Sequence, residues 1–201
     1  MRETMKKDIK NEIISAAREL FSINGYNAVT MRDVADALGI SVGNLTYHFK
    51  KKEDLIEAVI IDQHRGYRKH GEIKTLAALD GFLRYITEHH DKHQYYFRHY
   101  AQLSQLCPQV YQMQLSVMRD LYDTLRTALK NLRDAGLVRG EEFPGQTEGV
   151  IQSLMTTSCY SQPHFERWKD VSHDARKCMW SVVSLMLTAE GREAFTREIA
   201  L

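Results

Sequence analysis

Apolar residues recur every three or four positions along most of the chain, which is the spacing of one face of an α-helix. The first stripe ends at the pair Asn24-Gly25, which is typical of a left-handed helix stop. Its apolar members are Ile9, Ile13, Ala16, Ala17, Leu20 and Phe21. The sequence shows no strand-like alternation longer than a few residues, no internal repeat and no low-complexity tract. The pattern therefore predicts an all-α protein.

Two short helices are expected after the first. Thr30, with Asp33 three positions later, has the spacing of a capping box and predicts a helix running to Leu38. Gly39 ends that helix, and Ser41 is suited to the N-cap of the next one. The apolar positions of this next helix fall on one side and are Val42, Leu45 and Phe49.

The rest of the chain keeps helical spacing. Acidic residues at positions 53 and 54 suit the positive end of a fourth helix. Pro108 and Pro144 stand where helices are expected to begin, and Pro163 where one is expected to end. The scarcity of glycine (11) and proline (3) also favours long helices. The expected helical segments cover 53–74, 76–91, 94–106, 109–135, 146–162 and 173–189.

The two short helices contain the residues that a helix-turn-helix needs. Ala35 is small where the helices cross, Gly39 can adopt a positive φ in the turn, and Val42 and Leu45 hold the second helix down. At roughly 100° per residue, the opposite face of the second helix carries uncharged groups able to meet base edges and phosphates. These outward positions are Gly43, Asn44, Tyr47 and His48.

Side-chain chemistry divides the candidate DNA-binding residues by role, with Ser41 at the start of the same surface. Asn44 can pair bidentately with adenine, Thr46 can touch a thymine methyl or a phosphate, and Gly43 lets the backbone approach closely. The remaining candidates suit phosphate oxygens, which fix register without specifying sequence. They are Thr30, Arg32, Tyr47, His48, Lys50 and Lys52.

A structural alternative is a simple αα corner with a solvated basic end. The first 52 residues carry nine Lys and Arg against six Asp and Glu, and this local excess of three positive charges supports DNA binding only weakly. Periodicity and charge therefore leave both interpretations open.

The run from Gly39 to Leu55 reads GISVGNLTYHFKKKEDL, and AARELF at 16–21 and Gly25-Tyr26 precede it. Together these segments resemble the amino-terminal domain of the TetR/AcrR family of transcriptional regulators, over about residues 9 to 56. Many members carry tyrosine where Thr46 stands, so we expect the adjacent Tyr47 to take that contact.

The resemblance implies an amino-terminal three-helix domain with a helix-turn-helix and a larger helical domain after it. We place a DNA-binding domain at 1–52 and an effector-binding and dimerisation domain at 53–201. It further implies a homodimeric repressor that binds a palindromic operator in double-stranded DNA and is released by a small-molecule effector. The carboxy-terminal halves of the family diverge widely, so the resemblance does not name the effector.

Aromatic residues cluster in one later segment. Four of the six residues from Tyr95 to Tyr100 are aromatic. In similar proteins this position lies in helices that enclose the effector, and a mostly apolar cavity would suit an aromatic or amphipathic molecule. The alternative is that the rings fill the core. The effector-binding candidates are Tyr95, Tyr96, His99, Tyr100, Met113 and Trp168.

Two broad apolar stripes lie at 150–159 and 175–186. Two such helices per chain could pair with their symmetry mates as a four-helix bundle. Packing inside one chain is the alternative. The candidate dimer residues are Ile151, Leu154, Ser158, Cys178, Met179, Val182 and Met186.

Other chemistry is weakly represented. His89, His90 and His93 form an H-H-x-x-H run, whose spacing can hold zinc when further ligands converge. The sequence identifies no acid or cysteine partner for them, so we assign no metal and no cofactor. It also lacks the G-x-S-x-G, P-loop and H-E-x-x-H motifs, so a helical enzyme using the His and Tyr residues is the weaker alternative. A metal-responsive or activating regulator of the same fold is another.

Composition says more about the cellular compartment than about the function. The net charge is +1, so any polyanion must be bound locally. The three cysteines form no C-x-x-C pair, which favours a reducing compartment. The first ten residues mix both charges, and no apolar stretch of about 18 residues occurs. We therefore expect a cytoplasmic protein that is neither exported nor membrane-spanning.

Overall fold

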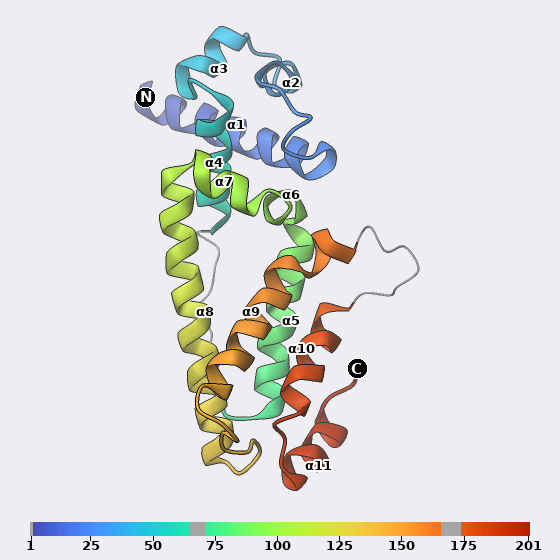
Figure 1. Ribbon diagram of the computed structural model, residues 1–201. Coiled ribbons are helices and arrows are strands. Elements are labelled where there is room, and N and C mark those ends of the chain that lie inside the picture. Colours follow the sequence, from blue (N-terminus) through green and yellow to red (C-terminus); the bar gives the residue numbers. More distant parts are fainter. Residues whose placement is uncertain (1, 65–70, 166–173) are drawn as a thin grey trace. The chain divides into compact units, whose positions relative to one another are not determined.

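The computed structural model describes residues 2–64, 71–165 and 174–201, with side chains described for 9–64, 71–159 and 174–201. In these ranges the chain is helical, which confirms the predicted all-α class, and the strand-like pairing found there is one isolated bridge between Val138 and Leu187. The helices, shown in Figure 1, are α1 (Arg2–Asn24), α2 (Met31–Ala37), α3 (Val42–His48), α4 (Lys52–His64), α5 (Leu76–Lys92), α6 (Gln94–Phe97), α7 (Tyr100–Leu106), α8 (Pro108–Asp134), α9 (Gln146–Phe165), α10 (Ala175–Ser184) and α11 (Ala189–Glu198).

Several predicted boundaries are wrong. Residues 71–75 are not helical, although we expected a helix from 53 to 74. The segment expected at 94–106 is two helices, because the backbone bends at Arg98 and His99. α9 continues past Pro163 to Phe165, and α11 lies where no helix was expected.

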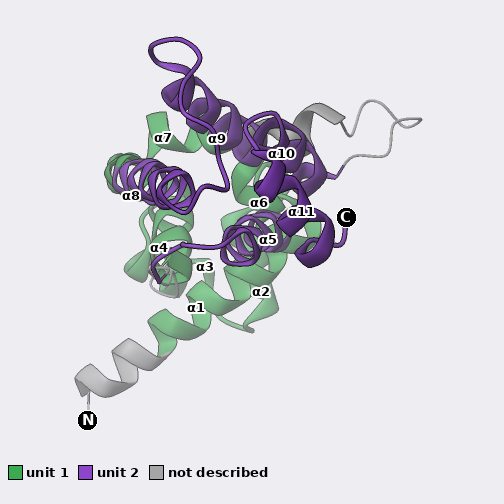
Figure 2. Cartoon of the chain, turned by 90° about the horizontal axis from the view of Figure 1, so that it is seen from below, with its two compact units in different colours: residues 1–68, 93–115 green, residues 69–92, 116–201 purple. Residues whose placement is uncertain are grey.

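The chain divides into two compact units, coloured separately in Figure 2. Unit 1 comprises Met1–Arg68 and His93–Leu115, and unit 2 comprises Lys69–Lys92 and Ser116–Leu201. This division follows contacts between residues. The functional division at residue 52 is a different kind of boundary and stays a prediction.

Unit 1 is built around the apolar stripe of α1. Ile13, Ala17 and Phe21 are fully buried against Leu45 from α3 and Leu55 from α4. The later segment of this unit adds buried side chains to the same cluster: Tyr95, Tyr96, Leu103, Cys107 and Val110. The three-helix amino-terminal domain therefore shares its core with α6 and α7.

Unit 2 has its own core, centred on Trp180, the bulkiest of its fully buried side chains. α11 packs closely on this unit at Gly191, where an added Cβ would lie 2.1 Å from the backbone oxygen of Leu137. Only a residue without a side chain fits this approach. This contact explains α11, whose sequence has a glycine in its first turn and only a weak apolar stripe.

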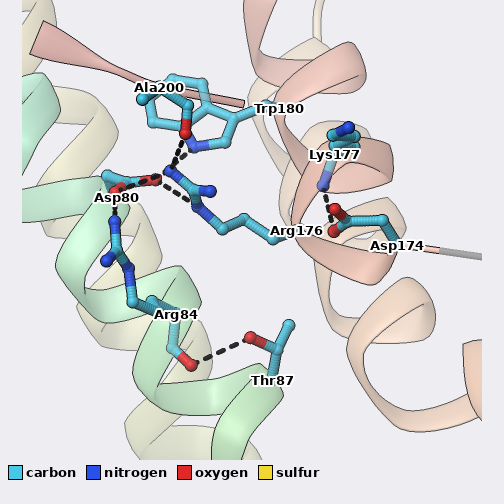
Figure 3. A network of polar contacts seen from close by, with 8 residues as sticks. All are labelled: Asp80, Arg84, Thr87, Asp174, Arg176, Lys177, Trp180 and Ala200. Atoms are coloured by element: carbon cyan, nitrogen blue, oxygen red, sulfur yellow. Dashed lines mark hydrogen bonds and ion pairs between the residues drawn. The ribbon is translucent and has the colours of Figure 1, made fainter.

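A buried carboxylate ties three parts of unit 2 together, as Figure 3 shows. Asp80 of α5 is 5% exposed. It accepts hydrogen bonds from Arg176 Nε at 2.7 Å, from Trp180 Nε1 at 2.8 Å and from Arg84 at 2.8 Å. Arg176 also donates to the backbone oxygen of Ala200 at 2.9 Å. The network therefore joins α5 and α10 to the end of the chain.

His90 makes a second polar link in unit 2. Its Nδ1 donates to the backbone oxygen of Ser158, which connects α5 to α9. Burial lowers the pKa of His90, the bond to Ser158 opposes that shift and the nearby His89 adds to it, so that the pKa is about 4. The ring is therefore neutral in the folded protein near pH 7.

We expect this histidine to make the protein sensitive to acid. An unfolded histidine titrates near 6.5, so between pH 6.5 and 4 the unfolded chain binds a proton that the folded chain does not. The free energy of unfolding should fall by about 3 kcal/mol over that window. Denaturant titrations at pH 7 and pH 4 of the wild type and of His90→Gln, which keeps a donor, measure it. Equal pH profiles for the two proteins would contradict the assignment.

Candidate nucleic-acid interface

The first helix of the pair, α2, begins with a complete capping box. The Thr30 side chain accepts from the backbone nitrogen of Asp33 at 3.2 Å, and an Asp33 oxygen accepts from the backbone nitrogen of Thr30 at 2.7 Å. These hydrogen bonds hold the pKa of Asp33 below its usual value. The predicted capping box is confirmed.

The turn between the two short helices is a Schellman motif. Gly39 has a φ of +64°, its nitrogen bonds to Asp36 oxygen at 3.1 Å, and Ile40 nitrogen bonds to Ala35 oxygen at 3.0 Å. A side chain at position 39 would strain this left-handed backbone. The expected positive φ at Gly39 is therefore confirmed, and it sets the angle at which α3 leaves α2.

The second helix, α3, is capped by Ser41, whose Oγ accepts from Asn44 nitrogen at 3.1 Å. Leu45 is fully buried and Phe49 is 4% exposed, as expected. Val42 is 37% exposed, so the expectation that it holds the helix down is wrong. It stands on the first turn of α3, beyond the edge of the core, and Leu45 carries the packing.

All ten predicted DNA-binding residues lie in unit 1, on the start of α2, on α3 and on the residues from α3 into α4. Their roles stay predictions, but their accessibility suits them. Thr46, His48 and Lys52 are half-buried. The exposed members are Thr30, Arg32, Ser41, Gly43, Asn44, Tyr47 and Lys50.

Tyr47 and Asn44 give this surface its character. Tyr47 is 67% exposed and meets the His48 ring edge-on, with 5.3 Å between ring centroids. The Asn44 side chain is exposed, and no hydrogen bond from its amide group is found among the described residues. The arrangement presents an amide and a phenol on one rigid, capped helix.

Comparison with known proteins agrees with this geometry. The family model for bacterial regulatory proteins of the tetR family matches residues 13–59, which run from α1 into α4. The HTH-type transcriptional regulator UidR of Escherichia coli K12 is 38% identical over 71 residues, covering 35% of this chain and 36% of that protein. The chain thus spans about a third of the length of this curated relative.

Solved structures extend the similarity of fold over nearly the whole chain. A TetR-family transcriptional regulator from Marinobacter aquaeolei VT8 covers 94% of this chain and 95% of its own, with a TM-score of 0.76 and 19% identity. A SmeT complex with triclosan covers 90% of this chain and 92% of its own, with a TM-score of 0.56 and 15% identity.

Over residues 13–59 the chain is therefore similar to the TetR family of transcriptional regulators. Members of this family are transcriptional regulators and not enzymes, so the comparisons support the interpretation as a non-enzyme over the enzyme alternative. The residues that the family model matches include the motifs at 16–21 and 39–55 on which the resemblance rests. The structural similarity adds the general course of the helices after α4.

The predicted effector residues lie in unit 1, except Trp168, which is outside the described residues. Tyr95 and Tyr96 are 4% and 6% exposed and belong to the core of the unit. The Tyr95 hydroxyl donates to Gln63 at 2.5 Å, and burial raises the pKa of Tyr95 to about 12 against the opposing charge of Arg18. This placement favours the core-filling alternative for these two rings.

The remaining effector candidates are less enclosed. His99, Tyr100 and Met113 are half-buried. Beside them lies Gln114, which was not among the predicted residues and whose buried amide donates to the Tyr96 hydroxyl at 3.0 Å. A polar residue on the apolar stripe of α8 was the signal that could have found it. The effector role of the set stays a prediction.

Four candidate dimer residues are buried by their own chain. Ile151, Leu154, Met179 and Met186 are at most 3% exposed and form part of the core of unit 2. Ser158 is 5% exposed. A second chain can reach only the accessible members, the exposed Cys178 and the half-buried Val182. The dimer interface stays a prediction, and these two residues are the ones through which it can be tested.

Among the described residues, no group of three or more His, Cys, Asp or Glu side chains is arranged to hold a metal ion. In the same part of the chain, no helix combines the length and apolar character that crossing a membrane requires.

Proposed function

We propose that the chain is a homodimeric repressor that binds a palindromic operator in double-stranded DNA and is released by a small-molecule effector. The observation that carries this proposal is the exposed polar face of α3, held between the capped turn at Gly39 and the buried Leu45. A rigid helix with an amide and a phenol on its outer face suits the major groove.

Two copies of that helix explain a palindromic target. In a two-fold dimer, recognition helices about 34 Å apart enter successive major grooves on one side of the duplex. An effector releases the operator only if it binds more tightly to a state in which this spacing differs. The SmeT complex with triclosan supports an aromatic small molecule as the class to test first. Binding to the chromosome would place the protein in the cytoplasm.

The experiment starts from a random-sequence pool of duplexes, from which the purified chain selects its target. We expect enrichment of a palindrome, binding of two chains per duplex, and an affinity that falls linearly with the logarithm of salt concentration. Weak binding without sequence preference would overturn the proposal. Aromatic and amphipathic compounds are then screened by fluorescence anisotropy for those that weaken operator binding.

A further inference from the structure

The ammonium group of Lys52 is already occupied within unit 1. It lies 4.2 Å from the centroid of the Tyr26 ring and 3.4 Å from the backbone oxygen of Asn27. A cation over an aromatic face within about 6 Å is attracted to it. Lys52 is half-buried, and desolvation lowers its pKa while Glu53 and Asp33 oppose that shift.

The Tyr26 ring is itself fixed in place. It is 3% exposed, with Phe21 at 5.7 Å and His99 at 5.9 Å between ring centroids. Burial, followed by the charges of Glu53 and Cys107, raises its pKa to about 12, so the ring stays neutral. It therefore gives Lys52 a rigid surface.

The contact closes one particular segment of the chain. Asn27 lies before α2 and Lys52 is the first residue of α4, so the segment between them contains both helices of the helix-turn-helix. Holding the two ends of a segment together reduces its conformational freedom before it binds. The carbonyl and the ring already take up part of the donor capacity of the ammonium, which leaves less of it for a phosphate.

We propose that Lys52 is a positioning residue for operator binding, which staples the ends of the helix-turn-helix segment through the Tyr26 ring and the Asn27 carbonyl. This inference rests on the proposed function, and it replaces the expected phosphate contact of Lys52 with an internal role. Arg32 and Lys50, which are exposed, remain the phosphate-binding candidates.

Salt dependence separates the two roles. Lys52→Met should weaken binding to the selected duplex about tenfold while leaving the slope of log affinity against log salt unchanged. Lys50→Met is the matched control for a direct contact and should reduce the slope by about 0.9 for each phosphate that the Lys50 ammonium neutralises. A reduced slope for Lys52→Met, or wild-type affinity, would overturn the inference.

Variants of Tyr26 and a conservative variant of Lys52 test whether the aromatic ring is needed. Tyr26→Phe and Lys52→Arg keep the cation over an aromatic face and should bind within about twofold of the wild type. Tyr26→Leu should lower the affinity for the duplex as much as Lys52→Met does. The double variant Tyr26→Leu/Lys52→Met should bind no more weakly than Tyr26→Leu alone. If the affinity losses of the two single variants add in the double variant, the proposed contact between Lys52 and the Tyr26 ring is contradicted. If Tyr26→Leu does not fold, the other three single variants still decide the question.

Hydrogen exchange of the DNA-free chain tests the role of Lys52 independently of the proposed function, because it needs no operator. Lys52→Met should speed exchange of the α2 and α3 amides several-fold and leave those of α9 unchanged. Unchanged exchange in α2 and α3 would overturn the positioning role of Lys52 even if the protein binds the operator. Failure of the wild type to select any duplex would instead count against the repressor proposal.

Discussion

Replacing Asp80 by alanine is expected to lower the free energy of unfolding by about 4 kcal/mol. The substitution leaves the guanidinium of Arg176, whose side chain is 17% exposed, without its carboxylate and removes the acceptor of the Trp180 indole. Removing one partner of a buried ion pair costs more than the pair contributes, because the other charge stays buried. Urea titrations followed by circular dichroism measure the decrease.

A matched substitution separates this network from ion pairs in general. Asp134→Ala breaks the exposed pair with Lys130, whose atoms lie 2.6 Å apart, and should cost less than about 1 kcal/mol. Equal decreases for the two variants would show that Asp80 has no special role.

The acid dependence of Asp80 has a definite sign. Burial on its own would raise the pKa of Asp80, but hydrogen bonds from Arg176, Trp180 and Arg84 outweigh it and hold the pKa below 3.8. The contribution to stability is therefore present above pH 3.8 and is lost as the pH falls through the folded-state value.

Local signals predicted the amino-terminal helices well because each boundary depends on a few neighbouring residues. Thr30 with Asp33 forms the box that its spacing indicates, and Gly25 and Gly39 adopt the positive φ that ends their helices. Sequence spacing is enough in such cases, because the interactions span only three to five positions.

Elements that depend on tertiary packing were missed. α11 exists because Gly191 fits against the backbone oxygen of Leu137, which lies far away in sequence. The bend at His99 likewise coincides with the contact between its ring and Tyr26. Apolar spacing identifies which face of a helix is buried but not which chain buries it. Ile151 was therefore expected in an interface, whereas it lies in the core of its own chain.

The candidate surface shows the same limit. Exposure of Asn44 and Tyr47 followed from counting positions on α3 from Val42, which put them opposite the buried Leu45. The partners of Lys52 did not follow, because its charge suits both a phosphate and a tyrosine ring and Tyr26 is distant in sequence. Charge alone assigned a role that only the fold could refine.

Asn44→Ala should have the largest effect on operator binding, a decrease of about a thousandfold in affinity for the selected duplex. A bidentate amide–adenine pair contributes about 1–3 kcal/mol, and the proposed dimer has two copies. The fold should be kept, because the side chain of Asn44 is exposed and its capped backbone nitrogen remains. Fluorescence anisotropy measures the affinity, and a second selection from random duplexes measures the preference.

The change in base preference tests whether Asn44 contacts a base. The variant should accept any base pair at one position of each half-site and keep the preference at the others, because a single base contact is removed. Gln152→Ala, at an exposed amide on α9, is the matched control and should bind as the wild type does. Uniform weakening with the preference intact would show that Asn44 contacts the backbone of the duplex. Unchanged binding and preference would show that Asn44 contacts neither a base nor the backbone of the duplex.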